Sequence, residues 1–159
     1  MHRGSMRMSN NSSRIATIID LDAVSGLFDA YRQFYLQPPD PALARQFIAE
    51  RMQNDESVIL LAFGGDGKAT GFCQLYPTFC SVEAKPIYWL YDLFVVPEAR
   101  SSGTGKLLLR AAERHASATG KARMDLMTAR TNQSAQALYK SLGWVRDEDF
   151  HAYSRRIGG

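Results

Sequence analysis

The chain has 159 residues, enough for one domain with a buried core, and its 45% hydrophobic and 22% charged residues are typical of a globular protein. No apolar run reaches the ~18 residues that a membrane-spanning helix needs, which argues against a membrane protein. The net charge is +3, or +1 without Arg3 and Arg7, and no block of Lys or Arg residues indicates a nucleic-acid-binding surface.

Residues 1–13 are expected to be a disordered leader outside the fold. They are polar, they lack the apolar core of a secretion signal, and the run Gly-Ser-Met at 4–6 resembles the remnant of an expression tag. Residues 14–157 are expected to form a single domain. Cys73 and Cys80 are too few for a disulfide framework, so we expect two reduced thiols in a cytoplasmic protein.

The first half of the chain shows both helical and strand patterns. Asp20 and Asp22 offer N-caps for a first helix, and a glycine-rich turn at 64–68 joins two dense apolar runs into a predicted hairpin. The predicted elements are a strand over 15–19, helices over 23–35 and 42–52, and strands over 57–63 and 70–80.

The second half continues with alternating strands and helices. Glycines at 120 and 143 are suited to end the two helices expected there. The predicted elements are a strand over 86–96, a helix over 103–119, a strand over 124–128, a short helix over 132–142 and a last strand over 150–156.

This order predicts an α/β fold (mixed α+β) in which helices cover a mixed sheet. The strand over 86–96, the helix that follows and the strand over 124–128 form a right-handed crossover, so these two strands are expected to be parallel. Ligands of such sheets bind at the carboxyl ends of the strands. The loop over 100–106 lies there.

That loop reads RSSGTGK at the start of a helix, where backbone N–H groups favour an anion. It fails as a nucleotide P-loop, because Arg100 and Leu107 replace the required Gly and Ser/Thr. It fails as a dinucleotide fingerprint, because Leu108 replaces the third glycine. What remains is R-x-x-G-x-G, which on its own could equally be a plain loop that caps a helix.

The surroundings of the loop are more specific. YDLFVVP at 91–97, then R-x-x-G-x-G, an amphipathic helix, a strand, Asn132 and ALYKSLGW at 137–144 together resemble the GNAT superfamily of acyl-CoA-dependent N-acyltransferases. The match runs over about 88–153. Ser101 departs from the pattern, since many members have Gly there. The resemblance implies a mostly antiparallel sheet with a splayed parallel strand pair and helices on both faces.

The resemblance also implies a function and a donor. It implies an N-acetyltransferase that moves the acetyl group of acetyl-CoA to a primary amine by direct attack in a ternary complex, with no metal. The acceptor would be a small amine, a polyamine, an amino acid or a protein amino group, and a homodimer is a further expectation. The alternative is a non-catalytic acyl-CoA-binding sensor or interaction module.

The donor site follows from the same resemblance. The loop would hold the pyrophosphate, the preceding strand would offer backbone groups to the pantetheine and the thioester carbonyl, and Asn132 would contact the pantetheine or cap its helix. The implied donor-binding residues are Phe94, Val95, Val96, Arg100, Ser101, Ser102, Gly103, Thr104, Gly105, Lys106 and Asn132.

Catalytic residues are carried over in the same way. Tyr139 matches the tyrosine that protonates the leaving thiolate, although it could simply be a packed aromatic residue. Asp92 is the first candidate for the general base, with Glu83 and Tyr91 as alternatives acting through water, and a structural role for Asp92 stays open. Tyr31, Tyr35 and Tyr91 are expected to shape the acceptor pocket. The histidines, cysteines and carboxylates show no metal-ligand spacing.

Overall fold

The computed structural model describes residues 10–158, so most of the predicted leader lies outside the described residues. The first strand begins at Ser12, inside the segment predicted as leader. The chain divides into two compact units, Met1–Met127 and Thr128–Gly159, and each is described by itself. No helix among the described residues is long and apolar enough to cross a membrane.

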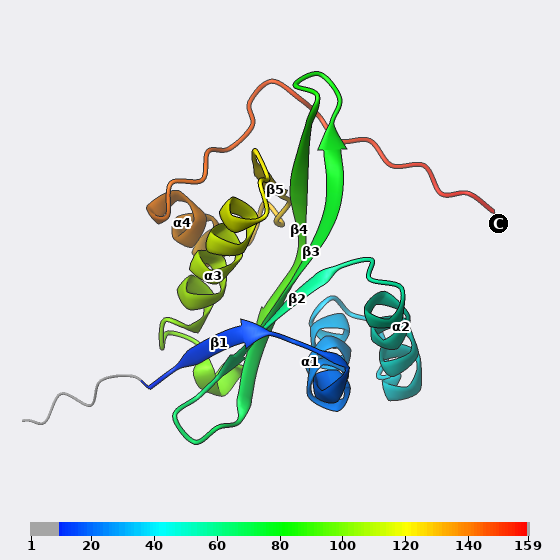
Figure 1. Cartoon of the computed structure of the whole chain (residues 1–159), viewed down its shortest axis with the longest axis vertical. Helices are drawn as coiled ribbons and strands as arrows, with labels where there is room; N and C mark the ends of the chain where they lie inside the picture. The colour runs from blue at the N-terminus through cyan, green and yellow to red at the C-terminus, as the bar shows by residue number, and fades with distance from the viewer. Residues whose placement is uncertain (1–9, 159) are drawn as a thin grey trace, which may run out of the picture. The chain divides into compact units, whose positions relative to one another are not determined.

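The first unit is built on a five-stranded sheet in the order β1-β2-β3-β4-β5 (Figure 1). The pairs from β1 to β4 are antiparallel, and β4 and β5 are parallel. This confirms the predicted mixed, mostly antiparallel sheet. The strands are β1 Ser12–Ile15, β2 Val58–Phe63, β3 Ala69–Cys80, β4 Lys85–Val95 and β5 Met124–Leu126.

Helices lie on both faces of this sheet. α1 (Leu21–Phe34) and α2 (Pro41–Gln53) pack together on one face, and α3 (Thr104–Ala118) crosses the other (Figure 1). The core between α1, α2 and the sheet is apolar because both helices turn an apolar stripe inward. Its most buried members include Val24, Phe28, Ala44, Ile48, Leu61 and Phe72.

The start of the fold differs from the sequence prediction. The strand expected over 15–19 is instead β1, followed by a short 3-10 helix, η1 (Ile18–Asp20). The Asp20 carboxylate accepts a hydrogen bond from the Thr17 N–H at 2.9 Å and pairs with Arg14 at 2.7 Å. These local bonds close a turn where apolar character alone suggested a strand.

The strand predicted over 150–156 is wrong. Those residues form neither helix nor strand and are exposed. A strand exists only where a neighbour completes its hydrogen bonds, and no pairing involves this segment. The second unit contains α4 (Gln133–Ser141), close to the helix predicted over 132–142.

β4 carries the feature that positions the site. It pairs with β5 only from Tyr88 to Leu90. On its other edge, the pairing with β3 skips Tyr91, because Leu90 lies opposite Leu75 while Asp92 lies opposite Gln74. This is a β-bulge, and it coincides with the end of the parallel pairing. Beyond the bulge, β4 continues to Val95 paired with β3 alone. β4 and β5 thus separate here, as predicted for the parallel strand pair.

Candidate active site

The splay leaves one backbone edge of β4 without a strand partner. The Val96 N–H donates to the Thr70 carbonyl of the β3 segment at 2.9 Å. Backbone groups alternate in direction along a strand, so those of Leu93 and Val95 are directed to the opposite edge. The Val95 carbonyl accordingly accepts the Arg100 Nε–H at 3.0 Å on that edge.

This geometry distinguishes between the three strand residues expected to contact the donor. Of Phe94, Val95 and Val96, only Val95 directs its backbone N–H to the open edge, because Phe94 and Val96 bond toward β3. Leu93 is the second residue whose N–H lies there. It could not be named from the sequence, since the bulge at Tyr91 sets which residues face which edge.

The loop before α3 offers backbone donors. Gly103, the N-cap of α3, has a φ of 84°, a left-handed conformation that glycine adopts freely. The first helical bond runs from the Leu107 N–H to the Gly103 carbonyl at 2.9 Å. The N–H groups of Thr104, Gly105 and Lys106 therefore have no acceptor within the helix, and the helix dipole favours an anion beside them.

Side chains hold this loop in shape. The Ser102 hydroxyl bonds to the Ala99 carbonyl and to the Thr104 hydroxyl, the latter at 2.8 Å. Thr104 is 2% exposed, so its side chain belongs to the packing of α3. The predicted loop residues thus fit an anionic group chiefly through main-chain N–H donors.

Arg100 ties the loop to β4. Besides its bond to Val95, its guanidinium lies 5.6 Å from the ring centre of Phe34 and 5.8 Å from that of Phe94. Lys106, the other predicted cation of the loop, is exposed in the first turn of α3.

Ser101 has a φ of 64°, so a residue with a Cβ occupies the left-handed region. That conformation costs a non-glycine residue about 1 kcal/mol. We expect Ser101→Gly to raise the free energy of unfolding by up to about 1 kcal/mol, as measured by urea denaturation. Ser102→Gly is the matched control, and it should destabilise because it removes the two hydroxyl bonds. A Ser101→Gly protein no more stable than the parent would contradict the strain.

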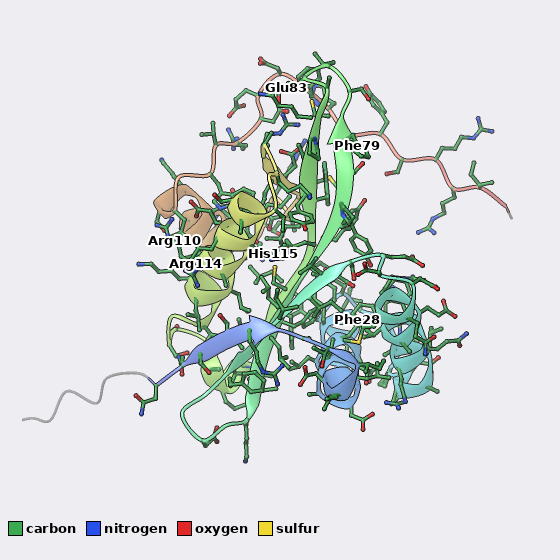
Figure 2. All side chains as sticks on the ribbon, viewed as in Figure 1. Phe28, Phe79, Glu83, Arg110, Arg114 and His115 are labelled. Carbon is green, nitrogen blue, oxygen red and sulfur yellow. The ribbon has the colours of Figure 1, made fainter. Side chains whose placement is uncertain are left out.

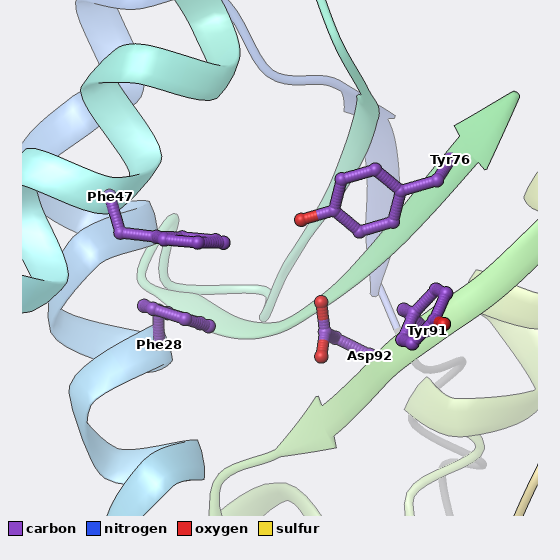
Figure 3. A pocket seen from close by; sticks show the side chains of 5 residues that line it. All are labelled: Phe28, Phe47, Tyr76, Tyr91 and Asp92. Atoms are coloured by element: carbon purple, nitrogen blue, oxygen red, sulfur yellow. The ribbon is translucent and has the colours of Figure 1, made fainter. Parts of the chain in front are cut away.

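A pocket of about 340 Å³ opens between the α1–α2 pair and the sheet (Figure 3). It is lined by Phe28 from α1, Phe47 from α2, Tyr76 from β3, and Tyr91 and Asp92 from β4. The Asp92 carboxylate points into it, between the ring of Phe28 and that of Tyr76 (Figure 3).

Asp92 is held by a chain of polar side chains. Gln74 is fully buried and its Nε2 donates to the Asp92 carboxylate at 2.7 Å, while its Oε1 accepts from the Ser57 hydroxyl at 2.8 Å. The Tyr31 side chain also bonds to Asp92. Burial nevertheless raises the pKa of Asp92 above its ordinary value, and these donors offset only part of the shift.

The predicted acceptor tyrosines are placed differently from one another. Tyr91 lines the pocket and is 55% exposed. Tyr31 packs edge-on against Phe72 at 5.7 Å, and its hydroxyl donates to the Tyr91 carbonyl at 3.4 Å. Tyr31 therefore orients the bulge and Asp92, and neither it nor Tyr35 is among the lining residues.

Phe28, Phe47 and Tyr76 line the pocket and were not predicted to do so. In sequence they look like ordinary core residues. The sequence could have indicated Tyr76, because side chains two residues apart on a strand share a face, and Tyr76 therefore lies on the same face of β3 as Phe72 and Gln74. Nothing local links Phe28 and Phe47, which belong to separate helices.

The alternative base Glu83 lies away from this pocket. It sits in the turn between β3 and β4, where Arg123 pairs with it at 3.5 Å. Figure 2 shows it at the tip of that hairpin, far from Phe28.

In the second unit, Asn132 is the N-cap of α4, and its side chain accepts from the Ala135 N–H at 3.2 Å. This is the structural role that the sequence left open beside a ligand contact. The ring of Tyr139 packs against Trp144 with centroids 6.0 Å apart. Within residues 10–158, no three His, Cys, Asp or Glu side chains are grouped as a metal site.

These features define a class of protein. A splayed strand with free backbone donors, an anion-binding helix start and a carboxylate in an aromatic pocket suit an enzyme that joins a long anionic donor to a small acceptor. Residues 24–144 match the acetyltransferase (GNAT) family. The chain belongs to this family, and it is an acetyl-CoA-dependent acetyltransferase.

Individual relatives agree with that assignment. An uncharacterized N-acetyltransferase, YhfO of Bacillus subtilis (strain 168), is 45% identical over 144 residues, covering 91% of this chain and 96% of that protein. The crystal structure of a probable acetyltransferase has a TM-score of 0.87 at 36% identity, covering 93% of this chain and 99% of that one.

A more distant structure shares the fold. It is an aminoglycoside N-acetyltransferase, AAC(6')-Iy, in complex with CoA, with a TM-score of 0.79 at 23% identity, covering 96% of this chain and 99% of that chain.

Proposed function

We propose that the protein transfers the acetyl group of acetyl-CoA to the amino group of a small molecule bound in the Asp92 pocket, by direct attack. One observation carries the proposal. Asp92 lines the pocket, and the next residue, Leu93, directs its N–H to the open edge of β4. A base for the acceptor and a donor for the thioester carbonyl are thus neighbours in the chain.

Each group has a step to perform. The Asp92 carboxylate takes a proton from the acceptor ammonium, because only the free amine can attack. The N–H groups of Leu93 and Val95 stabilise the negative charge that develops on the carbonyl oxygen. The C–N bond forms as the C–S bond breaks. The ammonium loses two protons overall, one of which ends on sulfur and the other in solvent.

The donor would lie along the open edge of β4, with its pyrophosphate at the start of α3. Gly103, Thr104, Gly105 and Lys106 supply backbone N–H groups there, and the residues before them shape the loop. Acetyl-CoA supplies the activated acyl group. Asn132, which caps α4, is proposed to contact the pantetheine.

Localisation and assembly belong to the proposal as well. Cys73 and Cys80 are both free, which supports a reducing compartment such as the cytoplasm. The homodimer expected from the resemblance stays a prediction.

Thiol release from acetyl-CoA across a panel of primary amines tests the proposal. An amine-dependent release that saturates with both substrates is expected. A protein that is stabilised by coenzyme A in a thermal-shift assay but releases no thiol with any amine would instead be the non-catalytic binder. Stabilisation by ATP and not by coenzyme A would reject the donor site.

Tyr139 is proposed to protonate the departing thiolate. We expect Tyr139→Phe to lower kcat by about 10²-fold at pH 7, as general acids typically contribute 10²- to 10⁴-fold. A thiol has a pKa of about 8.5, so the thiolate leaves more readily at high pH and the defect should shrink there. Steady-state kinetics from pH 6.5 to about 9.5 measure this, with affinity for coenzyme A determined separately.

The matched control is Tyr153→Phe, since Tyr153 is 93% exposed and has no proposed role. It should leave kcat within about twofold of the parent. Equal activity of Tyr139→Phe and the parent at every pH would remove Tyr139 from the mechanism.

A further inference from the structure

We infer that the acceptor is a small monoamine whose amino group is carried on an apolar, ring-sized body. The inference rests on the proposed function and names the substrate class of the same pocket. It is argued from the charge of the pocket, its walls and its size.

The pocket supplies one charge. Asp92 is the single carboxyl side chain among its five lining residues, and none of them is a lysine, arginine or histidine. Burial, together with the charge of Asp92, raises the pKa of Tyr76 to about 12, so the Tyr76 phenol is neutral at physiological pH. One carboxylate can pair with one ammonium. A second ammonium held in the same space would be desolvated without a partner, which is costly.

Carboxylates outside the pocket do not provide a partner for a second ammonium. The charge of Glu56 acts on Tyr76, but Arg51 pairs with Glu56 at 3.1 Å and with Glu50 at 3.3 Å. The Arg51 guanidinium lies 4.4 Å from the ring centre of Phe47. If the ligand carried a second cationic group that extended past Phe47, that group would therefore meet the Arg51 guanidinium. The carboxylates of Glu50 and Glu56 are already paired with Arg51.

The walls of the pocket are aromatic. The rings of Phe28 and Phe47 are stacked, with centroids 5.3 Å apart and planes 14° apart. Tyr76 meets Tyr91 edge-on at 5.3 Å. Ring faces and edges of this kind bind an apolar or aromatic body, and they also favour a cation that lies over them.

Size points to the same class. A volume of about 340 Å³ is near the lower end of the ~300–1,000 Å³ typical of small-molecule sites. In Figure 3 the Asp92 carboxylate faces the same space as the rings of Phe28, Phe47 and Tyr76, so an ammonium paired with Asp92 would carry its apolar body among those rings. A polycation such as an aminoglycoside, the substrate class named for several structures of similar fold, lacks matching charges here.

Direct binding tests the inference without relying on turnover. Isothermal titration calorimetry of the coenzyme A-saturated protein compares 2-phenylethylamine with 1,4-diaminobutane and with the aminoglycoside kanamycin. We expect a Kd for 2-phenylethylamine at least tenfold lower than for either polyamine. Equal or tighter binding of the diamine or of kanamycin, or no binding of 2-phenylethylamine, would overturn the inference.

A variant assigns the binding to the pocket. Phe47→Leu keeps an apolar wall but removes the ring, and it should raise the Kd for 2-phenylethylamine about fivefold or more. Phe79→Leu is the matched control, because Phe79 is 75% exposed on the β3–β4 hairpin, and it should leave that Kd unchanged. Equal effects of the two substitutions would place the amine elsewhere.

The two proposals fail in different ways. If 2-phenylethylamine binds as expected but no thiol is released from acetyl-CoA, the ligand class inferred for the pocket stands and the proposed acetyl transfer to that ligand fails. If thiol is released with polyamines and not with 2-phenylethylamine, acetyl transfer stands and the inference fails.

Discussion

Replacing Asp92 with asparagine is expected to lower kcat/KM for the amine by about 10²- to 10⁴-fold, the usual contribution of a positioned general base. The substitution keeps the size of the side chain and an oxygen that can accept from Gln74. It removes the charge that pairs with the ammonium and the basic oxygen that takes its proton. Steady-state kinetics at saturating acetyl-CoA measure the loss.

The same substitution is expected to stabilise the protein at neutral pH, because asparagine carries no charge to desolvate. Burial raises the pKa of Asp92, so the folded state favours the protonated acid more than the unfolded state does. As pH rises above the unfolded value of about 3.9, the unfolded state ionises first and the folded state loses relative stability. The loss is complete once pH exceeds the folded pKa.

Urea denaturation at several pH values follows this difference. The gain from Asp92→Asn should be absent below about pH 3.9 and should grow as the pH rises above that value. Asp149→Asn, at an exposed position with no proposed role, is the control and should change neither activity nor stability. An active Asp92→Asn enzyme would show that another group is the base. A less stable one would show that the hydrogen bonds from Gln74 and Tyr31 outweigh the cost of burial.

Local chemistry in the sequence explains why the geometry of the loop before α3 could be predicted. R-x-x-G-x-G places a glycine at Gly103, where φ is positive and α3 begins, and that geometry requires only neighbouring residues. The same argument explains why many family members have glycine where this chain has Ser101, since the residue at this position has a positive φ. Glycine is the unstrained choice there.

The bulge at Tyr91 could not be predicted from local pattern. Whether Leu90 or Tyr91 opposes Leu75 depends on how β3 and β4 pair over their whole length. The bulge decides which N–H groups reach the open edge and brings Asp92 opposite Gln74. The open edge of β4 is therefore a property of strand register, which the sequence of β4 alone does not contain.

The lining of the Asp92 pocket could be predicted only in part, for a similar reason. Asp92 and Tyr91 follow from a motif, whereas Phe28, Phe47 and Tyr76 come from three elements that meet through packing. Each of the three has the sequence spacing of a core residue. They line a pocket because of how α1 and α2 pack against the sheet, and that packing is not readable from local sequence.

Gly71 is the second position where a small change should have a large effect. It is buried on β3, opposite Val95. A Cβ at this position would lie 2.7 Å from the Phe94 carbonyl oxygen, and 3.3 Å from side-chain atoms of Leu108 and Val95. Because the closest atom is backbone, the clash is relieved only if β4 moves away from β3. We expect Gly71→Ala to lower the free energy of unfolding by about 2–3 kcal/mol.

Gly26→Ala is the matched control, because a Cβ there meets nothing within 4 Å and the residue is exposed inside α1. That substitution should stabilise by up to about 1 kcal/mol, since alanine is the better helix former. Urea denaturation compares the two variants. If both changed stability alike, the close approach of β3 and β4 at Gly71 would be excluded.

Function should respond to Gly71→Ala as well, even in protein that remains folded. Moving β4 displaces the Leu93 and Val95 N–H groups, and displacement of a positioned group by about 1 Å commonly costs 10²-fold in rate. We therefore expect folded Gly71→Ala protein to lose thiol release and coenzyme A-dependent stabilisation together. Loss of stability with both of these properties intact would mean that the open edge of β4 does not hold the donor.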